Sequence, residues 1–438
     1  MLNLPKTAGI YTLGCKVNQY ESQAIAEELE RRGFKILPPT VACDVYIINT
    51  CTVTAESDRK ARQFIRRAIS KNKDAFVIVT GCMAQTAAQA VAAIEGVDAV
   101  IGNTDKLRAA SIAEELVGKR QKNGIPLIFV EDIDTSDFEK MSITAFERTR
   151  AYVKIEDGCE SRCTYCIIPS ARGKIRSKPM SDVIDEVRTL TENGCREVVL
   201  TGIETASYGK DLIDTDLVTL LERIDGIEGI GRVRLGSLDP SFIKRDVAKR
   251  LSEIKCLAPH FHLSLQSGSS RILALMKRKY NARQAMNAIE LLREYIPEVK
   301  FTTDVIVGFP TETEEDFAET AEFLRQARFL TAHIFPYSKR SGTPAAVMSG
   351  QISKEEKSRR LHELEAIEAE ARSQLLWEEI TARPVKQVLF ETYKDGLATG
   401  HTADFLEVSV SSPRPMHTIF ADVRLLSTDG NTVFGELV

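Results

Sequence analysis

Three cysteines lie close together near the middle of the chain, within the stretch GCESRCTYC at residues 158–166. They are Cys159, Cys163 and Cys166, and all six histidines of the chain lie at position 260 or later. A structural zinc site closes with four Cys or His ligands, so zinc would need a distant residue to complete this set. Three thiolates also hold an iron–sulfur cluster with one open iron, where a substrate or cofactor would bind. We favour the second interpretation.

A second group of cysteines is spread over the first part of the chain, but each member follows a predicted strand. Cys15 follows TLG, Cys51 follows INT and Cys82 follows VTG. The carboxyl ends of parallel strands share one edge of an open sheet, so we expect these thiols to converge there. Isolated cysteines usually pack in the core. We expect that of the remaining ones, Cys43, Cys195 and Cys256.

The elements that must position these residues follow from alternating apolar runs and helical patterns. In the first 130 residues, strands are predicted at 8–14, 44–50, 75–81, 98–102 and 126–130. Helices are predicted between them, at about 18–32, 56–71, 83–94 and 104–118. This alternation is typical of an open parallel α/β sheet covered by helices.

A second alternating region follows a polar stretch at 131–150, and its first strand ends just before the 158–166 cysteines. Its six strands are predicted at 151–155, 197–202, 232–237, 260–266, 301–308 and 331–337. Six β/α units are too few for a closed eight-stranded barrel, so we expect a partial (β/α)6 barrel with a lateral opening. The cysteine loop would then lie on the carboxyl-end face, where barrel enzymes carry their chemistry.

The C-terminal part of the chain has a different pattern. A highly charged helical stretch is followed by short strands with turn residues, which predict a small antiparallel β-barrel. We therefore expect an N-terminal α/β domain at 1–130, the partial barrel at 146–352, a helical connector at 353–378 and the small barrel at 379–438.

Composition narrows the class of protein. A content of 43% hydrophobic and 27% charged residues is that of a globular protein with a sizeable core. No apolar run approaches the ~18 residues of a membrane helix, and we expect a cytoplasmic protein without disulfides. The net charge of −4 argues against general coating of nucleic acid. Basic residues nevertheless gather at 58–73, 150–178 and 271–283, which predicts a local polyanion surface unless these are ordinary solvated helix faces.

The C-x3-C-x2-C loop on the first strand of a partial barrel resembles the radical S-adenosylmethionine superfamily. In that superfamily the cofactor binds the open iron of a [4Fe-4S] cluster. One electron then cleaves a carbon–sulfur bond and produces a radical that abstracts hydrogen. The resemblance implies that Cys159, Cys163 and Cys166 hold such a cluster, while the protein orients S-adenosylmethionine and excludes water.

Further motifs resemble the methylthiotransferase family, namely TLGCKVNQYES at 12–22, NTCTVT at 49–54, GCMAQ at 81–85 and TTDVIVGFPTETEEDF at 302–317. The resemblance implies a second [4Fe-4S] cluster on Cys15, Cys51 and Cys82, again with an open iron. The terminal barrel resembles a TRAM domain, a small RNA-binding module. GCKVNQYES and NTCTVT look most like the branch that acts on threonylcarbamoyladenosine in tRNA.

The reaction implied for that branch adds a methylthio group to carbon-2 of the modified adenosine next to the anticodon. The implied partners are the tRNA anticodon stem-loop, an electron donor such as a flavodoxin or ferredoxin, and an unidentified sulfur donor. We expect a monomer. Two alternatives keep the chemistry but change the substrate to another modified tRNA adenosine or to a ribosomal-protein aspartate. A third is a zinc-stabilised RNA-binding protein without catalysis.

Polar residues at or near the barrel strand ends are expected to contact the cofactor. They are Tyr165, Thr201, Gly202, Glu204, Ser237, Asp239, Gln266 and Asp304. Basic residues beside the two cysteine sets are expected to line a shared tRNA groove. They are Arg66, Arg67, Arg172, Lys174 and Arg176. For His260 and His262, on one side of a strand, we expect packing rather than zinc binding.

The chain departs from the family pattern at four places. Glu160 stands where Asn is common, Ser170 where this branch often has Tyr, and Thr311 where Gly is usual. Glu204 stands where His is expected. The terminal barrel is acidic, with five Lys/Arg against eight Asp/Glu, which predicts stacking or shape contacts with RNA rather than electrostatic ones.

Overall fold

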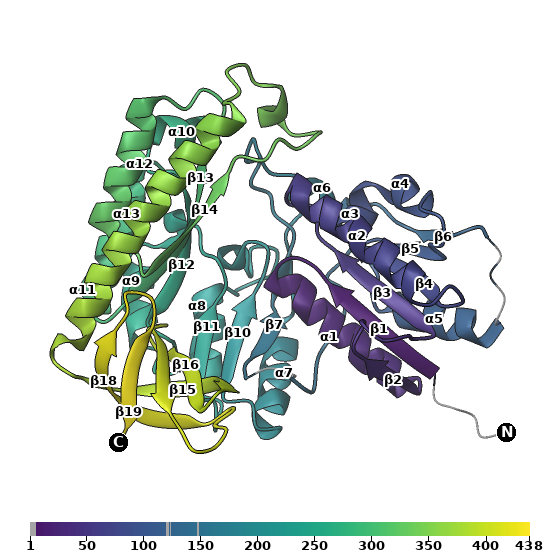
Figure 1. The fold of residues 1–438 in the computed structure, drawn as a ribbon, viewed down its shortest axis with the longest axis horizontal. Helices are drawn as coiled ribbons and strands as arrows, with labels where there is room; N and C mark the ends of the chain where they lie inside the picture. The colour runs from purple at the N-terminus through teal and green to yellow at the C-terminus, as the bar shows by residue number, and fades with distance from the viewer. Residues whose placement is uncertain (1–5, 120–121, 123, 147–148) are drawn as a thin grey trace.

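A six-stranded parallel sheet forms the first part of the chain in this computed structural model, which describes residues 6–119, 122, 124–146 and 149–438. The strand order is β2-β1-β3-β4-β5-β6 (Figure 1). The central strands β3 and β4 are buried along their whole length, because helices cover both faces. The strands are β1 (Lys6–Thr12), β2 (Phe34–Leu37), β3 (Val45–Thr50), β4 (Phe76–Gly81), β5 (Ala99–Ile101) and β6 (Leu127–Phe129).

The helices pack on this sheet in two layers, each over its own apolar cluster. Val45 and Ile47 of β3 face α1 and α5, whereas Tyr46 and Ile48 face α2, α3 and α4. The predicted open parallel α/β sheet is confirmed. Strand β2 was not predicted, because only Phe34 of its four residues is buried and its apolar signal is weak. The helices are α1 (Lys16–Arg31), α2 (Ala55–Lys71), α3 (Cys82–Thr86), α4 (Ala88–Ala92) and α5 (Arg108–Lys119).

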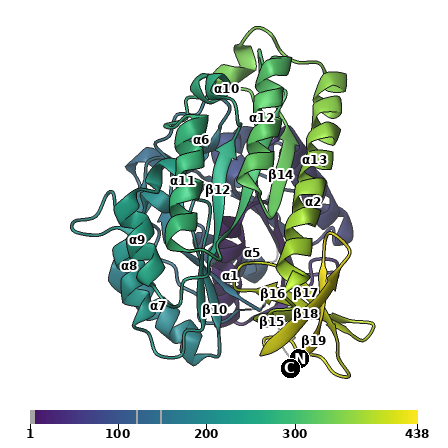
Figure 2. The ribbon, with the colours of Figure 1, turned by 90° about the vertical axis from the view of Figure 1, so that its left-hand side faces the viewer.

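Six further parallel strands form the predicted partial barrel, as two three-stranded sheets ordered β11-β10-β7 and β12-β13-β14. Isolated bridges from Val233 to Leu257 and from Leu238 to Leu263 connect the two sheets. Figures 1 and 2 show the helices on the outside of the curved wall. The strands are β7 (Ala151–Lys154), β10 (Glu197–Thr201), β11 (Arg232–Leu235), β12 (His260–Gln266), β13 (Lys300–Val307) and β14 (Thr331–Pro336).

The connections of the barrel carry its remaining elements. A two-stranded antiparallel ribbon, β8 (Glu156–Asp157) with β9 (Arg176–Ser177), closes the base of the cysteine loop and was not predicted. The α-helices are α6 (Ile168–Arg172), α7 (Met180–Glu192), α8 (Leu217–Asp225), α9 (Arg245–Glu253), α10 (Ser270–Leu275), α11 (Ala282–Tyr295) and α12 (Glu314–Ala327). Short 3-10 helices are η1 (Ile133–Thr135), η2 (Thr205–Ser207), η3 (Pro240–Phe242) and η4 (Pro344–Val347).

A long helix, α13 (Lys354–Thr381), leads to a closed five-stranded barrel ordered β15-β16-β17-β19-β18. All its strand pairs are antiparallel except β17 with β19. Arg234 of β11 donates to the carbonyls of Thr402 and Ala403, and His260 of β12 stacks on Phe405. The small barrel is therefore docked on the central one. Its strands are β15 (Val385–Lys394), β16 (Leu397–Thr402), β17 (Glu407–Ser411), β18 (Phe420–Thr428) and β19 (Val433–Leu437).

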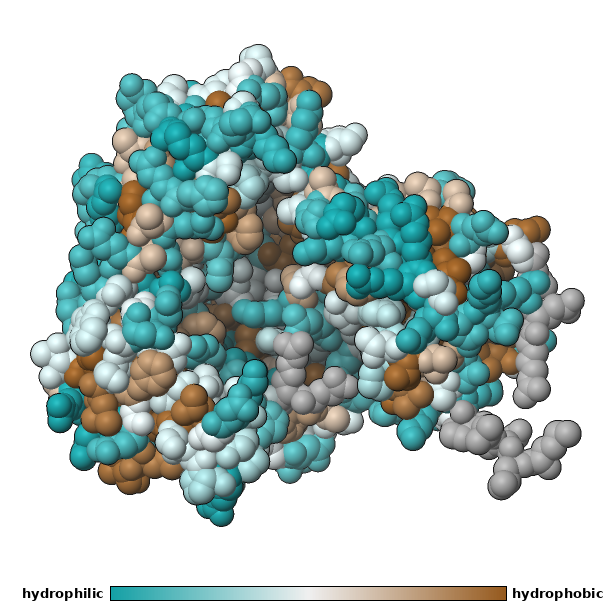
Figure 3. All heavy atoms as spheres, viewed as in Figure 1, coloured by the Kyte–Doolittle hydropathy of each residue, from teal (hydrophilic) through white to brown (hydrophobic). Residues whose placement is uncertain are grey.

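The molecule is hollowed where the N-terminal sheet meets the central barrel, as Figure 3 shows in the middle of the view. The N-terminal sheet lies on one side of this hollow and the barrel strands on the other (Figure 1). Among the described residues, no helix combines the length and apolar character needed to cross a membrane. The predicted domain limits stay predictions.

Candidate functional site

The N-terminal cysteines lie at the carboxyl ends of three neighbouring strands. Cys15 is the N-cap of α1 after β1, Cys51 follows β3, and Cys82 opens α3 after β4. Gly14 has a φ of 103°, and a Cβ there would lie 2.8 Å from Cys51 Cβ and 3.1 Å from its Sγ. Glycine thus lets the Cys15 loop approach Cys51 closely. The sheet order brings the three thiols to one edge.

The pKa values of these thiols depend on the short distances between them. Burial raises the pKa of Cys51 to about 11, and the neighbouring Cys82 and Cys15 thiols contribute in the same direction. Cys15 is exposed to solvent on one side, but the protein atoms packed around its thiol raise its pKa, against the lowering effect of the Arg172 guanidinium. Thiols held in this way lose their protons when a metal cation compensates the thiolate charge.

The second cysteine set lies on the loop between β8 and α6. Gly158 has a φ of 90°, and a Cβ there would collide with the Lys174 carbonyl oxygen at 1.8 Å. The Cys159 amide donates to the Gly173 carbonyl at 2.9 Å, and the Cys166 amide donates to the Cys163 carbonyl at 3.1 Å. These bonds fold the loop back on itself, so its three thiols lie on a short, well-fixed turn.

Charged side chains from the neighbouring connections of the barrel contact this loop. The Cys159 thiol donates to Glu204 at 3.3 Å, and the Ser161 hydroxyl donates to the same carboxylate at 3.1 Å. Burial, then the Glu204 charge, raises the pKa of Cys159 to about 12. On the other side, Arg278 donates to Cys163 Sγ at 3.3 Å and to Asp239 at 3.0 Å.

The neighbours of Glu204 determine the pKa of its carboxyl. Burial acts to raise the pKa of its carboxyl, but Lys279, at 3.7 Å, and the hydrogen bond from Cys159 outweigh burial and lower it. Beneath it, Glu156 is fully buried, and its Oε2 accepts from the Glu204 amide at 2.9 Å. Burial raises the pKa of the Glu156 carboxyl well above its usual range. Glu156 was not predicted from the sequence, although an acid directly after an apolar strand was a signal.

Arg172 joins the two cysteine sets. It is the last residue of α6, which follows the second cysteine loop, and it is fully buried. Its Nε donates to Cys82 Sγ at 3.3 Å, and its NH2 donates to Asn18 Oδ1 at 2.5 Å. Its NH1 pairs with Glu21 at 2.5 Å and Asp157 at 3.1 Å. A side chain from the barrel therefore reaches the cysteines of the N-terminal sheet.

Two buried lysines complete this network. Lys154 Nζ lies 2.8 Å from Glu21 and 2.6 Å from Asp157, and Lys106 also pairs with Glu21. Burial alone would raise the pKa of Asp157, but Arg172 and Lys154 lower it to about 2. Sequence reasoning missed all four of these charged residues around Arg172. The one available signal was a lysine at the end of the apolar strand AYVK.

The prediction that five basic residues line a tRNA groove is wrong for two of them. Arg172 is fully buried and Arg176 is 4% exposed, with its guanidinium donating to the carbonyls of Ile133 and Arg172. Both stabilise the junction rather than face an RNA. Lys174 is exposed, and Arg66 and Arg67 are exposed on α2, where they line a shallow groove.

The predicted cofactor contacts are only partly brought together. Glu204 and Asp239 reach the cysteine loop, directly and through Arg278. Thr201 is buried at the end of β10, and Gly202 packs on Glu156, where a Cβ would lie 2.5 Å from Oε2. The others are Tyr165, packed in the cluster of Phe309 and Tyr337, Ser237 after β11, and Gln266, at a bulge with a φ of 69°.

Asp304 lies within a barrel strand and not at its carboxyl end. It is in the middle of β13, 3.3 Å from His262 Nε2, and no contact joins it to the cysteine loop among the described residues. His260 packs as predicted, with its Nε2 3.1 Å from Thr302 Oγ1 and its ring on Phe405. Glu160 is exposed on the cysteine loop, and nothing in the structure explains why an acid stands there.

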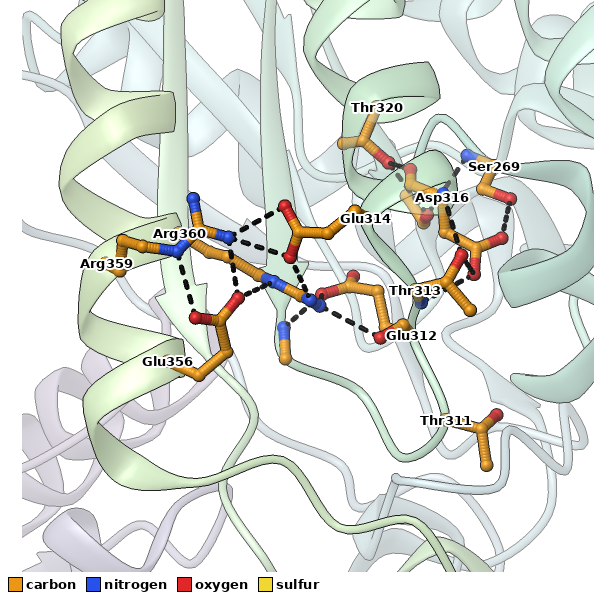
Figure 4. Close-up of polar contacts among 12 residues, drawn as sticks. Ser269, Thr311, Glu312, Thr313, Glu314, Asp316, Thr320, Glu356, Arg359 and Arg360 are labelled. Atoms are coloured by element: carbon orange, nitrogen blue, oxygen red, sulfur yellow. Dashed lines mark hydrogen bonds and ion pairs between the residues drawn. The ribbon is translucent and has the colours of Figure 1, made fainter.

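The rim of the barrel is fixed by the loop before α12, which Figure 4 shows with its polar contacts. Thr313 and Asp316 form a capping box at the start of α12, and the Ser269 hydroxyl donates to Asp316 at 2.7 Å. Arg360 of α13 pairs with Glu312 and with Glu314, each at 2.7 Å. These pairs fasten the connector helix to the strands that carry the site.

The donor chemistry of the two sets fits iron–sulfur clusters. In the part of the chain that the structure describes, no three Cys, His, Asp or Glu side chains are arranged to hold one metal ion. In a four-iron cluster each thiolate binds a different iron, so its ligands are spread more widely. Arg172 and Arg278 each donate to a cysteine sulfur, as suits the sulfur ligands of an anionic cluster.

Comparison with known families gives two matches along the chain. Residues 153–324 match the model described as the Radical SAM superfamily. Residues 7–102 match the model described as Uncharacterized protein family UPF0004. In fold, the chain is similar to the radical S-adenosylmethionine methyltransferase TsrM from Kitasatospora setae, with a TM-score of 0.59, 16% identity and 78% and 77% of the two chains covered.

Two curated proteins are more similar to this chain in sequence than TsrM is. The chain is 39% identical over 427 residues to the threonylcarbamoyladenosine tRNA methylthiotransferase MtaB of Bacillus subtilis, covering 96% of this chain and 94% of that one. It is 37% identical over 366 residues to the tRNA-2-methylthio-N(6)-dimethylallyladenosine synthase of Carboxydothermus hydrogenoformans, covering 82% of each.

Proposed function

The chain belongs to the methylthiotransferase family of radical S-adenosylmethionine enzymes, and from this premise we propose that it adds a methylthio group to carbon-2 of N6-threonylcarbamoyladenosine in tRNA. The single observation that carries the proposal is the Arg172 junction, which sets two three-cysteine groups beside each other. The match to the threonylcarbamoyladenosine enzyme of Bacillus subtilis spans nearly the whole of both chains, which supports this substrate.

The six cysteines would hold the two [4Fe-4S] clusters of such an enzyme, three cysteines to each. When bound, these clusters supply the electron that cleaves S-adenosylmethionine and an open iron for the sulfur to be transferred. The protein supplies a fixed loop for Cys159, Cys163 and Cys166 and a sheet edge for the second set, Cys15, Cys51 and Cys82.

The residues around the second cysteine loop would orient S-adenosylmethionine. Glu204, ionised and half-buried beside Cys159, is placed to accept from the amino group of the cofactor. Arg278, anchored by Asp239, holds the other side of the loop at Cys163. The remaining proposed contacts are Tyr165, Thr201, Gly202, Ser237, Gln266 and Asp304, of which Asp304 lies in the middle of β13 beside His262.

The partners follow from this function. The substrate is the anticodon stem-loop of a tRNA, and the exposed Arg66, Arg67 and Lys174 are proposed to contact its phosphates. A flavodoxin or ferredoxin is proposed as the electron donor, with a separate sulfur donor. We place a monomeric enzyme in the cytoplasm, where tRNA is modified.

The proposal is tested by mass spectrometry of tRNA nucleosides from a strain that lacks the gene. Wild-type protein should restore the methylthio form of threonylcarbamoyladenosine. Replacement of Cys159, Cys163 and Cys166 by Ala, or of Cys15, Cys51 and Cys82 by Ala, should leave it absent. Cys256→Ala, which changes a buried cysteine outside both sets, should restore it. A normal level of the nucleoside in the deletion strain would contradict the proposal.

Iron analysis of the anaerobically purified protein gives an independent measurement. About eight irons per chain are expected for two four-iron clusters, falling to about four in either triple variant. Zinc in place of iron would support the non-catalytic alternative. If the clusters are present but tRNA is unchanged, the methylthio form of a ribosomal-protein aspartate or of dimethylallyladenosine is the next product to measure.

A further inference from the structure

Phe335 lies near the carboxyl end of β14, the last strand in the order β12-β13-β14, and its side chain is 49% exposed. Exposure of a single apolar residue on an outer surface is ordinary, so the location of the residue decides its meaning. Of the other exposed aromatic residues in the described part of the chain, Trp377 lies on α13, and Tyr393 and Phe434 lie on the small barrel. Phe335 is therefore the exposed aromatic residue of the central barrel.

The alternation of side chains along β14 places Phe335 on the concave face of the barrel wall. Ala332 and Ile334 pack in the core beneath the helices, which cover the outside of the wall (Figures 1 and 2). Since successive side chains of a strand point to opposite faces, Phe335 points away from those helices. His333, on the same face as Phe335, has its ring 6.4 Å from that of His262 on β12. Phe335 therefore faces the interior of the barrel.

The segment that follows Phe335 contacts the N-terminal cysteine edge. Arg340 donates to the Thr52 hydroxyl at 2.7 Å and pairs with Asp58 at 2.8 Å. Thr52 directly follows Cys51, and Asp58 lies on the first turn of α2. The carboxyl end of β14 is thus fastened beside the loop that carries one of the N-terminal cysteines.

The same segment also contacts the second cysteine loop. The Ala345 amide donates at 2.8 Å to the carbonyl of Thr164, which lies within that loop. Tyr337 follows Phe335 closely in the sequence and is buried in one apolar cluster with Ala345, against which Tyr165 of the loop packs. Contacts to both cysteine sets therefore start from the few residues after β14, so the exposed ring of Phe335 lies between the two sets.

We propose that Phe335 stacks on the adenine ring of the target nucleotide and holds it between the two cysteine sets. The inference rests on the proposed function and names a residue that positions its substrate. In that function carbon-2 of the base must lie within reach of both sets, because one set serves the cleavage of S-adenosylmethionine and the other serves the sulfur to be transferred. The flat, exposed ring of Phe335 faces the space that such a base has to occupy.

The physical basis is the stacking of a planar base on an aromatic ring. Proteins that bind single-stranded RNA loops commonly unstack a base and place it on a Phe, Tyr or Trp side chain, which removes apolar area of both rings from water. Two other bases could occupy the same ring: a different base of the anticodon loop, and the adenine of S-adenosylmethionine. The three occupants respond differently when the target base alone is removed from the RNA.

The test measures equilibrium binding of two anticodon stem-loops to the reconstituted holoenzyme without S-adenosylmethionine. The two RNAs are identical except that the target nucleotide is threonylcarbamoyladenosine in one and lacks its base in the other. The wild type should bind the complete RNA more tightly. Phe335→Ala should weaken binding of the complete RNA by about tenfold, as for the loss of one stacked base, and leave binding of the abasic RNA unchanged. Phe335→Tyr should keep the preference, whereas Phe335→Leu should lose most of it.

Trp377→Ala, which removes an exposed aromatic side chain on α13, is the matched control and should keep the wild-type difference between the two RNAs. Iron content and thermal unfolding of each variant show whether the site and fold are intact. Truncation of the half-exposed Phe335 should change Tm little, because it leaves no cavity in the core.

A preference that survives in Phe335→Ala would overturn the inference, and is the result expected if the ring instead holds the adenine of S-adenosylmethionine. An equal loss for both RNAs would assign Phe335 to another base of the loop and also overturn it. Full retention by Phe335→Leu would overturn stacking as the cause. A wild type that shows no preference but forms the methylthio product would overturn the inference alone. A wild type with neither preference nor product would overturn the proposed function.

Discussion

Thr311 is a single residue with an unusual backbone conformation. Its φ is 68°, in the left-handed region that glycine occupies without strain. For a β-branched residue this conformation is an outlier and costs on the order of 1–3 kcal/mol. The side chain is exposed, and the loop is fixed by the Arg271 bond to the Thr311 carbonyl at 2.6 Å. The strain is thus imposed by the surrounding loop, seen in Figure 4.

We expect Thr311→Gly to stabilise the protein by about 1 kcal/mol, because relief of the backbone strain exceeds the entropy that glycine adds to the unfolded chain. The shift in Tm measures this. Thr311→Ala is the matched control, since its Cβ keeps most of the strain and its Tm should change little. Equal stabilisation by both substitutions would show that the backbone conformation is not the cause.

At the scale of elements, the junction of α1 with α6 holds the site together. Glu21 on α1 is fully buried and receives Arg172 from α6, Lys154 from β7 and Lys106. Burial acts to raise the pKa of Glu21, but these three cations outweigh it and lower that pKa well below the usual range. Its stabilising contribution is therefore present above the unfolded-state pKa of about 4.5 and is lost as the pH falls toward the folded-state value.

Glu21→Gln should destabilise the protein by about 3–5 kcal/mol near neutral pH, because it leaves buried cations without a partner. Thermal unfolding measures the loss, which should shrink as the pH is lowered below about 4.5. Glu56→Gln breaks an exposed pair with Arg59 on α2 and should change Tm little. An unchanged Tm for Glu21→Gln would mean that the network does not stabilise the junction.

At the scale of the whole molecule, three parts of the chain surround one hollow. The N-terminal sheet supplies one cysteine set, the central barrel supplies the other, and the small barrel docks on β11 and β12 below them (Figure 1). Exposed cations lie on α2 of the N-terminal part and at Lys174 of the central part, whereas the terminal barrel has an acidic balance. We therefore expect the N-terminal sheet and the central barrel, rather than the terminal barrel, to attract RNA electrostatically.

We expect Lys174→Glu and the double change of Arg66 and Arg67 to Glu to weaken tRNA binding and to flatten its salt dependence. For every phosphate that a variant no longer neutralises, the slope of log K against log salt should fall by about 0.7–0.9. Filter binding over a salt series measures this. Lys249→Glu, on α9 outside the barrel, is the control and should leave the slope unchanged. An unchanged slope in the first two variants would place the tRNA elsewhere.

Much of the fold and of the candidate site could be predicted from the sequence, because the signals are local. Cys159, Cys163 and Cys166 lie on one loop, so their spacing alone indicates a shared site. The alternation of strands and helices also predicted the open sheet and the six barrel strands. Where the signal was weak, prediction failed, as for the half-exposed β2 and the two-residue strands β8 and β9.

The tertiary structure alone decided which charges are buried. Arg172 stands in a basic stretch that resembles an RNA-binding surface, but its main partner Glu21 lies 151 residues away. A sequence pattern records the type of a side chain and its near neighbours, whereas the burial of a charge depends on partners that only folding brings together.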